Sequence, residues 1–215
     1  MLYKDGAIEL RRRDRWTVMM IFVVMMAFLF ALSLGSHVAD LHAALPGILW
    51  MAFLFAGMIG MGKTFANEVR EEALTGLILA PGDKIAIYLA KLTGAFVFMV
   101  LIEIVSTPLF LEVFQVPWRG PWTLWLLILA LGAAGFVEVG TLLSTMSVHT
   151  SSGDLILTML LLPLEIPVMI MTVQATRDLL TLTRAGFWLW IHGLIAYDAI
   201  FLVLPLMLYD YVWEV

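Results

Sequence analysis

Of the 215 residues in this chain, 62% are apolar and only 13% are charged, and a mean hydropathy of +0.99 is too high for a water-exposed surface. A net charge of -5 argues against nucleic acid as a partner, because phosphate binding requires clustered basic residues. The absence of cysteine excludes disulfides, thiolate metal sites and covalent haem attachment. These bounds predict an all-α, polytopic membrane protein.

The first segment, residues 2–15, places Leu2, Ile8 and Leu10 among charged residues (LYKDGAIELRRRDR). This pattern predicts an N-terminal interfacial helix lying on the membrane ahead of the first span. The alternative is a basic anchor that only fixes orientation. The apolar stretch that follows has no small-residue cleavage site before Gly35, so we interpret it as a retained span.

Six apolar stretches meet or nearly meet the length of about 20 residues that a bilayer core of about 30 Å requires. In the third, Pro108 lacks the amide that a helix interior uses, which predicts a kink or break near Thr107. The segments between the stretches are too short to bury a second core, so residues 1–215 form one permease-like membrane domain. The expected spans cover residues 16–35, 45–62, 85–114, 122–146, 155–175 and 186–209.

Basic residues near the span ends predict that both termini are cytoplasmic, because cytoplasmic loops carry an excess of Lys and Arg. Three basic residues fall on the other side of the membrane: Arg119, Arg177 and Arg184. Nine fall on the side of the termini: Lys4, Arg11, Arg12, Arg13, Arg15, Lys63, Arg70, Lys84 and Lys91.

The cytoplasmic segment 63–84 is polar but keeps apolar residues at roughly helical spacing, and it ends at Pro81 and Gly82. We interpret it as a short amphipathic coupling helix that docks in a groove of a soluble motor subunit. A solvated hairpin is the alternative. The candidate contact residues are Phe65, Glu68, Val69, Glu71, Glu72, Leu74 and Leu77.

Residues 57–64 (GMIGMGKT) satisfy the phosphate-loop pattern G-x-x-x-x-G-K-[ST]. We reject a nucleotide site there, because the pattern requires a strand before the loop and these glycines end a membrane span. Gly57, Gly60 and Gly62 are expected instead to permit close packing of helices.

Four acidic residues fall at membrane depth, where a charge costs a few kcal/mol, and they are functional candidates for that reason. They are Glu103, Glu138, Glu165 and Asp198. Each is otherwise a neutral carboxyl, or one paired across helices or at a subunit contact. Glu165 stands out because Pro163 and Pro167 flank it and leave backbone carbonyls that need other partners. No pair has a spacing that suggests catalysis, so no catalytic residue is assigned.

Four histidines are scattered along the chain, with His37 and His42 expected in the first outer loop, His149 in an inner loop and His192 in the last span. Any of them could ligate haem iron, but a loop histidine is more often ordinary surface. We therefore expect no metal site and no cofactor bound directly by this chain.

Several segments together resemble the haem exporter protein B (CcmB-type) family, the membrane subunit of the ABC-type complex of cytochrome c maturation. They are ELRRRDRW before the first span, PGILWMAFLFAGM in the second, Phe65, Glu68, Leu74, Leu77 and Pro81, LAKL at 89–92, and LLLPLEIPVMI at 160–170. The resemblance covers nearly the whole chain, and the last motif is the most specific. The family usually has Gly near position 72 and an acidic residue near 75, where this chain has Glu72 and Thr75.

The resemblance implies a bacterial inner-membrane subunit without a catalytic site of its own, paired as a homodimer with a cytoplasmic ABC ATPase. It also implies a haem-handling membrane protein, a small single-span protein and a periplasmic haem chaperone as partners, with haem and ATP bound by those partners. ATP hydrolysis would then drive release of the haem-loaded chaperone. The alternatives are a permease of another ABC exporter (lipid, polysaccharide or drug), a scaffold without transport, and an intramembrane enzyme.

Overall fold

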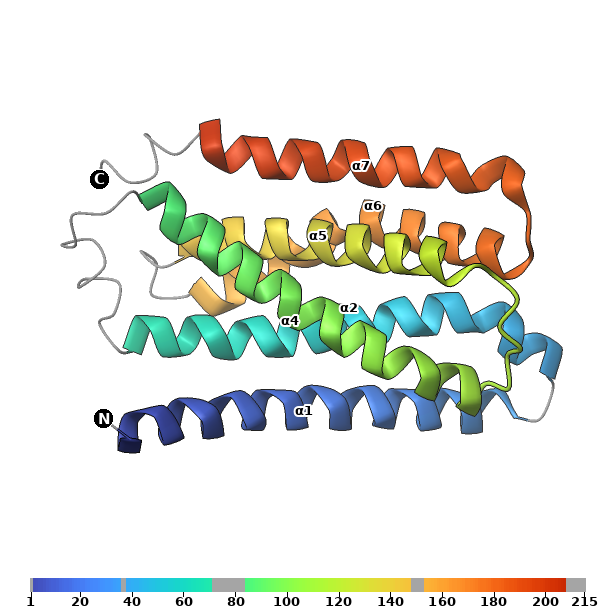
Figure 1. Cartoon of the computed structure of the whole chain (residues 1–215), viewed down its shortest axis with the longest axis horizontal. Helices are drawn as coiled ribbons and strands as arrows, with labels where there is room; N and C mark the ends of the chain where they lie inside the picture. The colour runs from blue at the N-terminus through green and yellow to red at the C-terminus, as the bar shows by residue number, and fades with distance from the viewer. Residues whose placement is uncertain (1, 36–37, 71–83, 148–152, 208–215) are drawn as a thin grey trace.

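A computed structural model describes residues 2–35, 38–70, 84–147 and 153–207 of the chain (Figure 1). Over those ranges the chain is helical apart from short turns, and it contains no strand there. Each helix has a segment long and apolar enough to cross a bilayer, which confirms the prediction of a six-span, all-α membrane protein. The helices are α1 (Leu2–Leu34), α2 (Val38–Arg70), α4 (Lys84–Val113), α5 (Trp122–Ser147), α6 (Gly153–Leu180) and α7 (Arg184–Met207).

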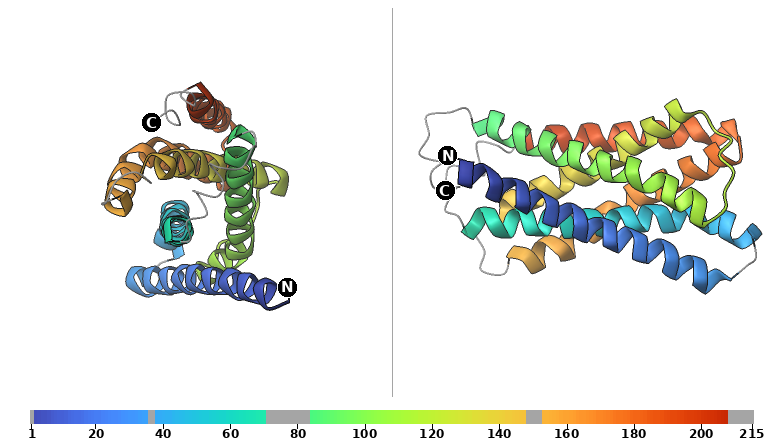
Figure 2. Two further views of the ribbon diagram at one scale, coloured as in Figure 1. Left: turned by 90° about the vertical axis from the view of Figure 1, so that its left-hand side faces the viewer. Right: turned by 60° about the horizontal axis from the view of Figure 1, so that its bottom comes forward.

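The helices run side by side and alternate in direction, so α1 begins and α7 finishes at the same end of the bundle (Figure 1). We call this the basic end, after Arg11, Arg12 and Arg13 near the start of α1, and the other the tryptophan end, after Trp118 and Trp122. Viewed along the bundle, α2 lies in the middle, with α1, α4, α5 and α6 around it and α7 outside (Figure 2).

The N-terminal segment forms one helix with the first span. Residues 2–15 belong to the same uninterrupted helix, α1, and their position at the membrane interface stays a prediction. The segment contains no proline and only Gly6 as a weak helix former, so it offers no residue that would force a break before the span.

In the third span, α4 continues as one helix through Pro108, so a break there is wrong and the kink stays a prediction. Beside the proline, the Thr107 hydroxyl donates a hydrogen bond of 2.7 Å to the Glu103 carbonyl. Continuing the helix keeps the remaining backbone groups paired within α4, which apolar surroundings demand.

The second helix is longer than its predicted span, since α2 begins at Val38 and passes through Pro46. His42 therefore lies in α2 and not in a loop, which corrects that expectation. Residues 57–64 are helical throughout, so the phosphate-loop pattern does not form a loop.

Glycines on α2 permit the close helix contacts that the sequence predicted. A methyl group added at Gly57 would stand 2.5 Å from a ring carbon of Phe136 on α5, and one at Gly60 would stand 2.6 Å from the Met19 sulfur on α1. Both distances are inside van der Waals contact, so glycine at these positions lets α2 pack this closely without moving the Phe136 ring or the flexible end of Met19. The packing of Gly62 lies outside what the structure describes.

At the tryptophan end, α4 and α6 stop in the same way although neither has a glycine there. Gln115 and Leu182 adopt the left-handed conformation, with φ of 53° and 57°. The next amides bond back to the helix, Val116 N–H to the Leu111 carbonyl and Thr183 N–H to the Asp178 carbonyl. This is the Schellman arrangement, which satisfies carbonyls at a helix end.

Candidate functional site

Four carboxyl groups lie inside the spans, one on each helix from α4 to α7. Glu103, Glu138, Glu165 and Asp198 are 0%, 4%, 1% and 8% exposed. The helices of this chain alone bury all four, so shielding them from lipid does not require a second subunit. Burying a carboxyl at membrane depth is costly, so the presence of four such groups marks this region as the candidate site.

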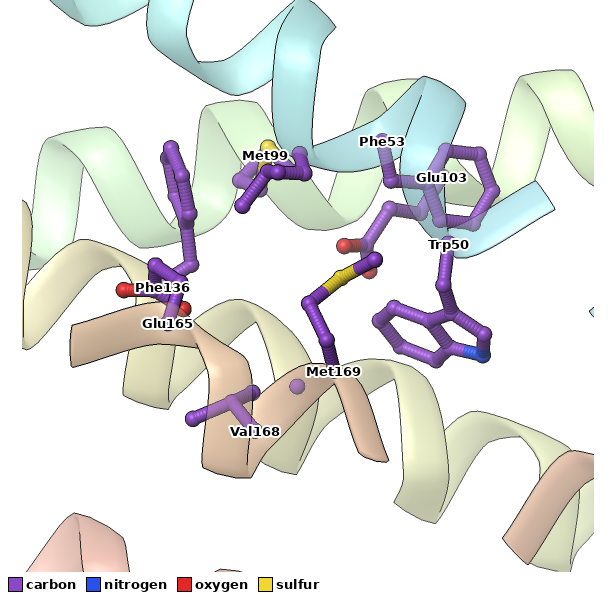
Figure 3. Close-up of a pocket in the computed structure, with 10 residues that line it drawn as sticks. Trp50, Phe53, Met99, Glu103, Phe136, Glu165, Val168 and Met169 are labelled. Carbon is purple, nitrogen blue, oxygen red and sulfur yellow. The ribbon is translucent and has the colours of Figure 1, made fainter. Parts of the chain in front are cut away.

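Glu103 and Glu165 line a common cavity between α4 and α6, in the interior of the bundle (Figure 3). The cavity leaves about 10 Å³ for the centre of a water molecule, roughly the minimum that one water needs. Figure 3 shows the Glu103 carboxyl directed toward the middle of the lining, among apolar side chains. The other lining residues are Trp50, Phe53, Leu54, Met99, Gly132, Phe136, Val168 and Met169.

The carboxyl oxygens at this cavity lack protein partners. Both oxygens of Glu103 and Oε1 of Glu165 are fully buried, and they accept no hydrogen bond from the described part of the chain. Buried polar groups in proteins are nearly always hydrogen-bonded, so three unpartnered oxygens at one cavity call for a ligand or a proton.

Asp198 joins Glu165 and Glu138 in a second polar group, made by α5, α6 and α7. It lies close enough to each of them for charges on the carboxyls to repel. Gly135, one turn before Glu138, allows α7 to approach, since a methyl group there would stand 3.0 Å from Asp198 Oδ1. Three carboxyls that the sequence places on separate spans are therefore near enough in the fold for a charge on Asp198 to act on the other two.

The proline-rich turn of α6 receives a hydroxyl from α7, at a carbonyl other than the two that Pro163 and Pro167 leave without an amide donor, those of residues 159 and 163. Pro163 and Pro167 both lie inside the continuous helix α6. The Tyr197 hydroxyl donates a hydrogen bond of 2.7 Å to the Leu164 carbonyl, next to Glu165. This contact fixes α7 against the turn that carries the carboxyl.

Trp50 closes the other side of the cavity and joins α2, α5 and α6. Its indole N–H donates to the Thr176 hydroxyl at 2.8 Å. The ring lies directly over Gly132, where even a methyl group would overlap it. A side chain that fills space and hydrogen-bonds across helices holds this wall in one position.

Sequence reasoning found the carboxyls but missed most of this lining. Trp50, Gly132 and Tyr197 give no signal of their own within apolar spans, because any aromatic or small residue suits a span. A faint signal exists in the spacing of Gly132 and Gly135, which marks one face of α5 for close approach.

The two histidines of the described residues lie on different helices, and His37 and His149 lie outside the described residues. His42 Nε2 lies 2.9 Å from the Gln115 carbonyl at the tryptophan end. His192 is exposed on α7, beside Trp188. No three His, Asp or Glu side chains in the described ranges converge closely enough to hold a metal ion.

Most of the predicted coupling surface lies outside the residues that the structure describes. Phe65, Glu68 and Val69 lie in the last turns of α2, at the basic end, and only their backbone is described. Glu71, Glu72, Leu74 and Leu77 lie outside the described residues, so the coupling surface stays a prediction.

The chain is similar to several known proteins along most of its length. Heme exporter protein B of Pseudomonas aeruginosa is 28% identical over 197 residues, which is 91% of this chain and 88% of that protein. Heme exporter protein B of Rhodobacter capsulatus is 26% identical and that of Paracoccus denitrificans 25%, each over 178 residues, 82% of this chain and 81% of the relative.

A family model described as CcmB protein matches residues 1–207, which include all six helices and the four buried carboxyls. The match covers the segments on which the resemblance was argued, from ELRRRDRW to LLLPLEIPVMI. The chain therefore belongs to the CcmB protein family.

Proposed function

We propose that this chain is the membrane subunit of an ABC-type haem export complex in cytochrome c maturation. The observation that carries the proposal is membership of the CcmB protein family over residues 1–207, together with six helices able to span a membrane. Its curated relatives bear the name heme exporter protein B. In this role the chain moves helices within the bacterial inner membrane while a separate cytoplasmic subunit hydrolyses ATP.

The proposed orientation places the basic end in the cytoplasm. The start of α1, the end of α2 and the start of α4 share this end, and so do the basic residues near them (Figure 1). Arg119, Arg177 and Arg184 belong to the tryptophan end. The excess of positive charge at one end supports this orientation.

The proposed mechanism couples ATPase closure to the bundle through the segment 63–84. This segment continues from α2, the central helix, and leads into α4, which carries Glu103 (Figure 2). A displacement of the segment would therefore act directly on two helices that enclose the cavity. The proposed outcome is release of the haem-loaded periplasmic chaperone by a complex of two such chains, two ATPases, a haem-handling protein and a small single-span protein.

The test is co-expression of this chain with its candidate ATPase and haem-handling partners, purification of the complex, and measurement of haem on the chaperone with and without ATP. ATP-dependent release of the loaded chaperone is the expected result. A stable complex with the ATPase alone, indifferent to haem and chaperone, would instead identify a permease of another ABC exporter.

Reversing charge on the proposed coupling surface tests its role. Glu68→Lys combined with Leu74→Asp should strongly reduce co-purification of the ATPase, because it removes an acidic and an apolar contact together. Asp40→Lys, a charge reversal at the far end of α2, should leave co-purification unchanged. Equal ATPase recovery with both variants would refute the coupling surface.

The role of Glu165 as a subunit contact is a separate proposal. Glu165→Gln keeps the size of the side chain but removes the carboxyl, so the assembled complex should lose stability if a neighbouring subunit pairs with it. Size-exclusion profiles and chaperone release that match the unmodified complex would rule out that pairing.

A further inference from the structure

We propose that Glu103 and Glu165 form an intramembrane proton-binding site, in which the two carboxyls that line one cavity are held neutral and each carries an exchangeable proton. The observations are the common cavity between α4 and α6 and the complete burial of both side chains. Both oxygens of Glu103 and Oε1 of Glu165 accept no hydrogen bond from the described residues, so no described donor stabilises a charge on Glu103 and none reaches Oε1 of Glu165.

Charge balance requires a cation at this cavity. Two carboxylates in an apolar interior carry a large desolvation cost unless a positive charge compensates them. The ten lining residues include no Lys, Arg or His, so none of them supplies that charge. The compensating species must therefore come from outside the lining.

A proton fits the cavity better than a metal ion. Calcium takes about six to eight oxygen ligands and magnesium needs near-octahedral coordination, whereas this lining offers only two carboxyl groups among aliphatic, thioether and aromatic side chains. The room for roughly one water centre also leaves no space for a hydrated ion. A proton needs only one oxygen and one neighbouring acceptor.

Further titratable groups interact electrostatically with Glu165 and with its neighbours. Asp198 from α7 interacts with Glu165, and Glu138 from α5 interacts with Asp198. Tyr88 near the basic end of α4 interacts with Glu138. From α2, Trp50 contributes an indole that already bonds to Thr176. Tyr197 from α7, whose hydroxyl bonds to the Leu164 carbonyl, also interacts with Glu165, so each of these titratable groups bears on the charge of the site.

Infrared difference spectroscopy on the full chain in lipid, purified with its accompanying subunits, tests this site. The stretching band of a protonated carboxyl shifts when H2O is exchanged for D2O. We expect Glu103→Gln to abolish one such band at neutral pH and Glu165→Gln to abolish another. Glu112→Gln is the matched control, since Glu112 is an exposed glutamate on the same helix, and it should leave the spectrum unchanged.

A second measurement needs no substitution. Apolar carbodiimides add across the O–H of a protonated carboxyl in a membrane, with no leaving group, and leave an adduct that mass spectrometry locates. Adducts on Glu103 or Glu165, and several-fold fewer on Glu112, are expected, with a decrease as pH rises. If neither glutamate is labelled and no carboxyl band depends on Glu103, or if sodium ions alone remove the band, the proton site is refuted. Neither readout depends on haem export, so the outcome is independent of the proposed function.

Discussion

Helices α1 and α5 differ in what surrounds them, although both are strongly apolar. α1 has the higher mean hydropathy, yet only 17% of its spanning window is buried, against 72% for α5. Ile21, Met25 and Phe28 of α1 are all more than half exposed. Side chains that face lipid and side chains buried inside the bundle are both apolar. Hydropathy alone therefore does not distinguish a lipid-facing helix from a buried one.

What separates the two helices is the presence of small and polar residues. α5 carries Gly132, Gly135 and Glu138 on faces that other helices cover, whereas the spanning part of α1 is built from larger apolar side chains. Small residues let backbones approach, and polar residues need partners that lipid does not offer. Of these two helices, the one with the lower hydropathy is thus the one that other helices cover.

The largest expected effect comes from removing an aromatic ring from the bundle interior, compared with removing one from the lipid-facing surface. Phe53 on α2 is fully buried and makes edge contacts with Trp50 and Phe110, at centroid distances of 5.6 and 6.4 Å. Phe53→Ala should lower the free energy of unfolding by about 3–5 kcal/mol, because it leaves a cavity. Phe28→Ala on α1 should cost far less. Unfolding in mixed micelles measures both, and similar losses would show that α1 is covered by another subunit and does not face lipid.

A smaller loss of stability is expected from placing a larger side chain at a close contact between two helices. Gly132→Leu forces a side chain into the Trp50 indole and toward Thr172, and should cost about 1–3 kcal/mol of stability. Gly94→Leu is its counterpart on α4, where no atom lies within 4 Å of an added methyl group, so it should be neutral or slightly stabilising. Thermal unfolding monitored by size exclusion compares them, and equal melting temperatures would contradict the close contact at Gly132.

The smallest effect concerns one interhelical hydrogen bond. Thr176→Val removes the acceptor of the Trp50 indole and should cost about 1 kcal/mol, as such bonds do in membrane bundles. Thr181→Val is matched to it, because both hydroxyls also donate to the carbonyl four residues earlier and Thr181 is exposed. A blue shift of the emission of a single-tryptophan variant that retains Trp50 would accompany the change only in Thr176→Val.

The number of spans was readable from the sequence because each needs about 20 apolar residues, and the described helices bear this out. Helix ends were less readable. The segment 2–15 contains charges but no break, so it continues α1, and Pro108 lies within α4 because the helix keeps its neighbouring backbone groups paired.

The sequence by itself determined that this chain is a helical membrane protein, that Glu103, Glu138, Glu165 and Asp198 lie at membrane depth, and which family it resembles. Only the tertiary structure decided which helix is central and which carboxyls share a cavity. The physical reason is that hydropathy is a property of each span alone. Grouping Glu103 with Glu165 depends instead on how glycines such as Gly57 and Gly132 let α2, α5 and α6 approach.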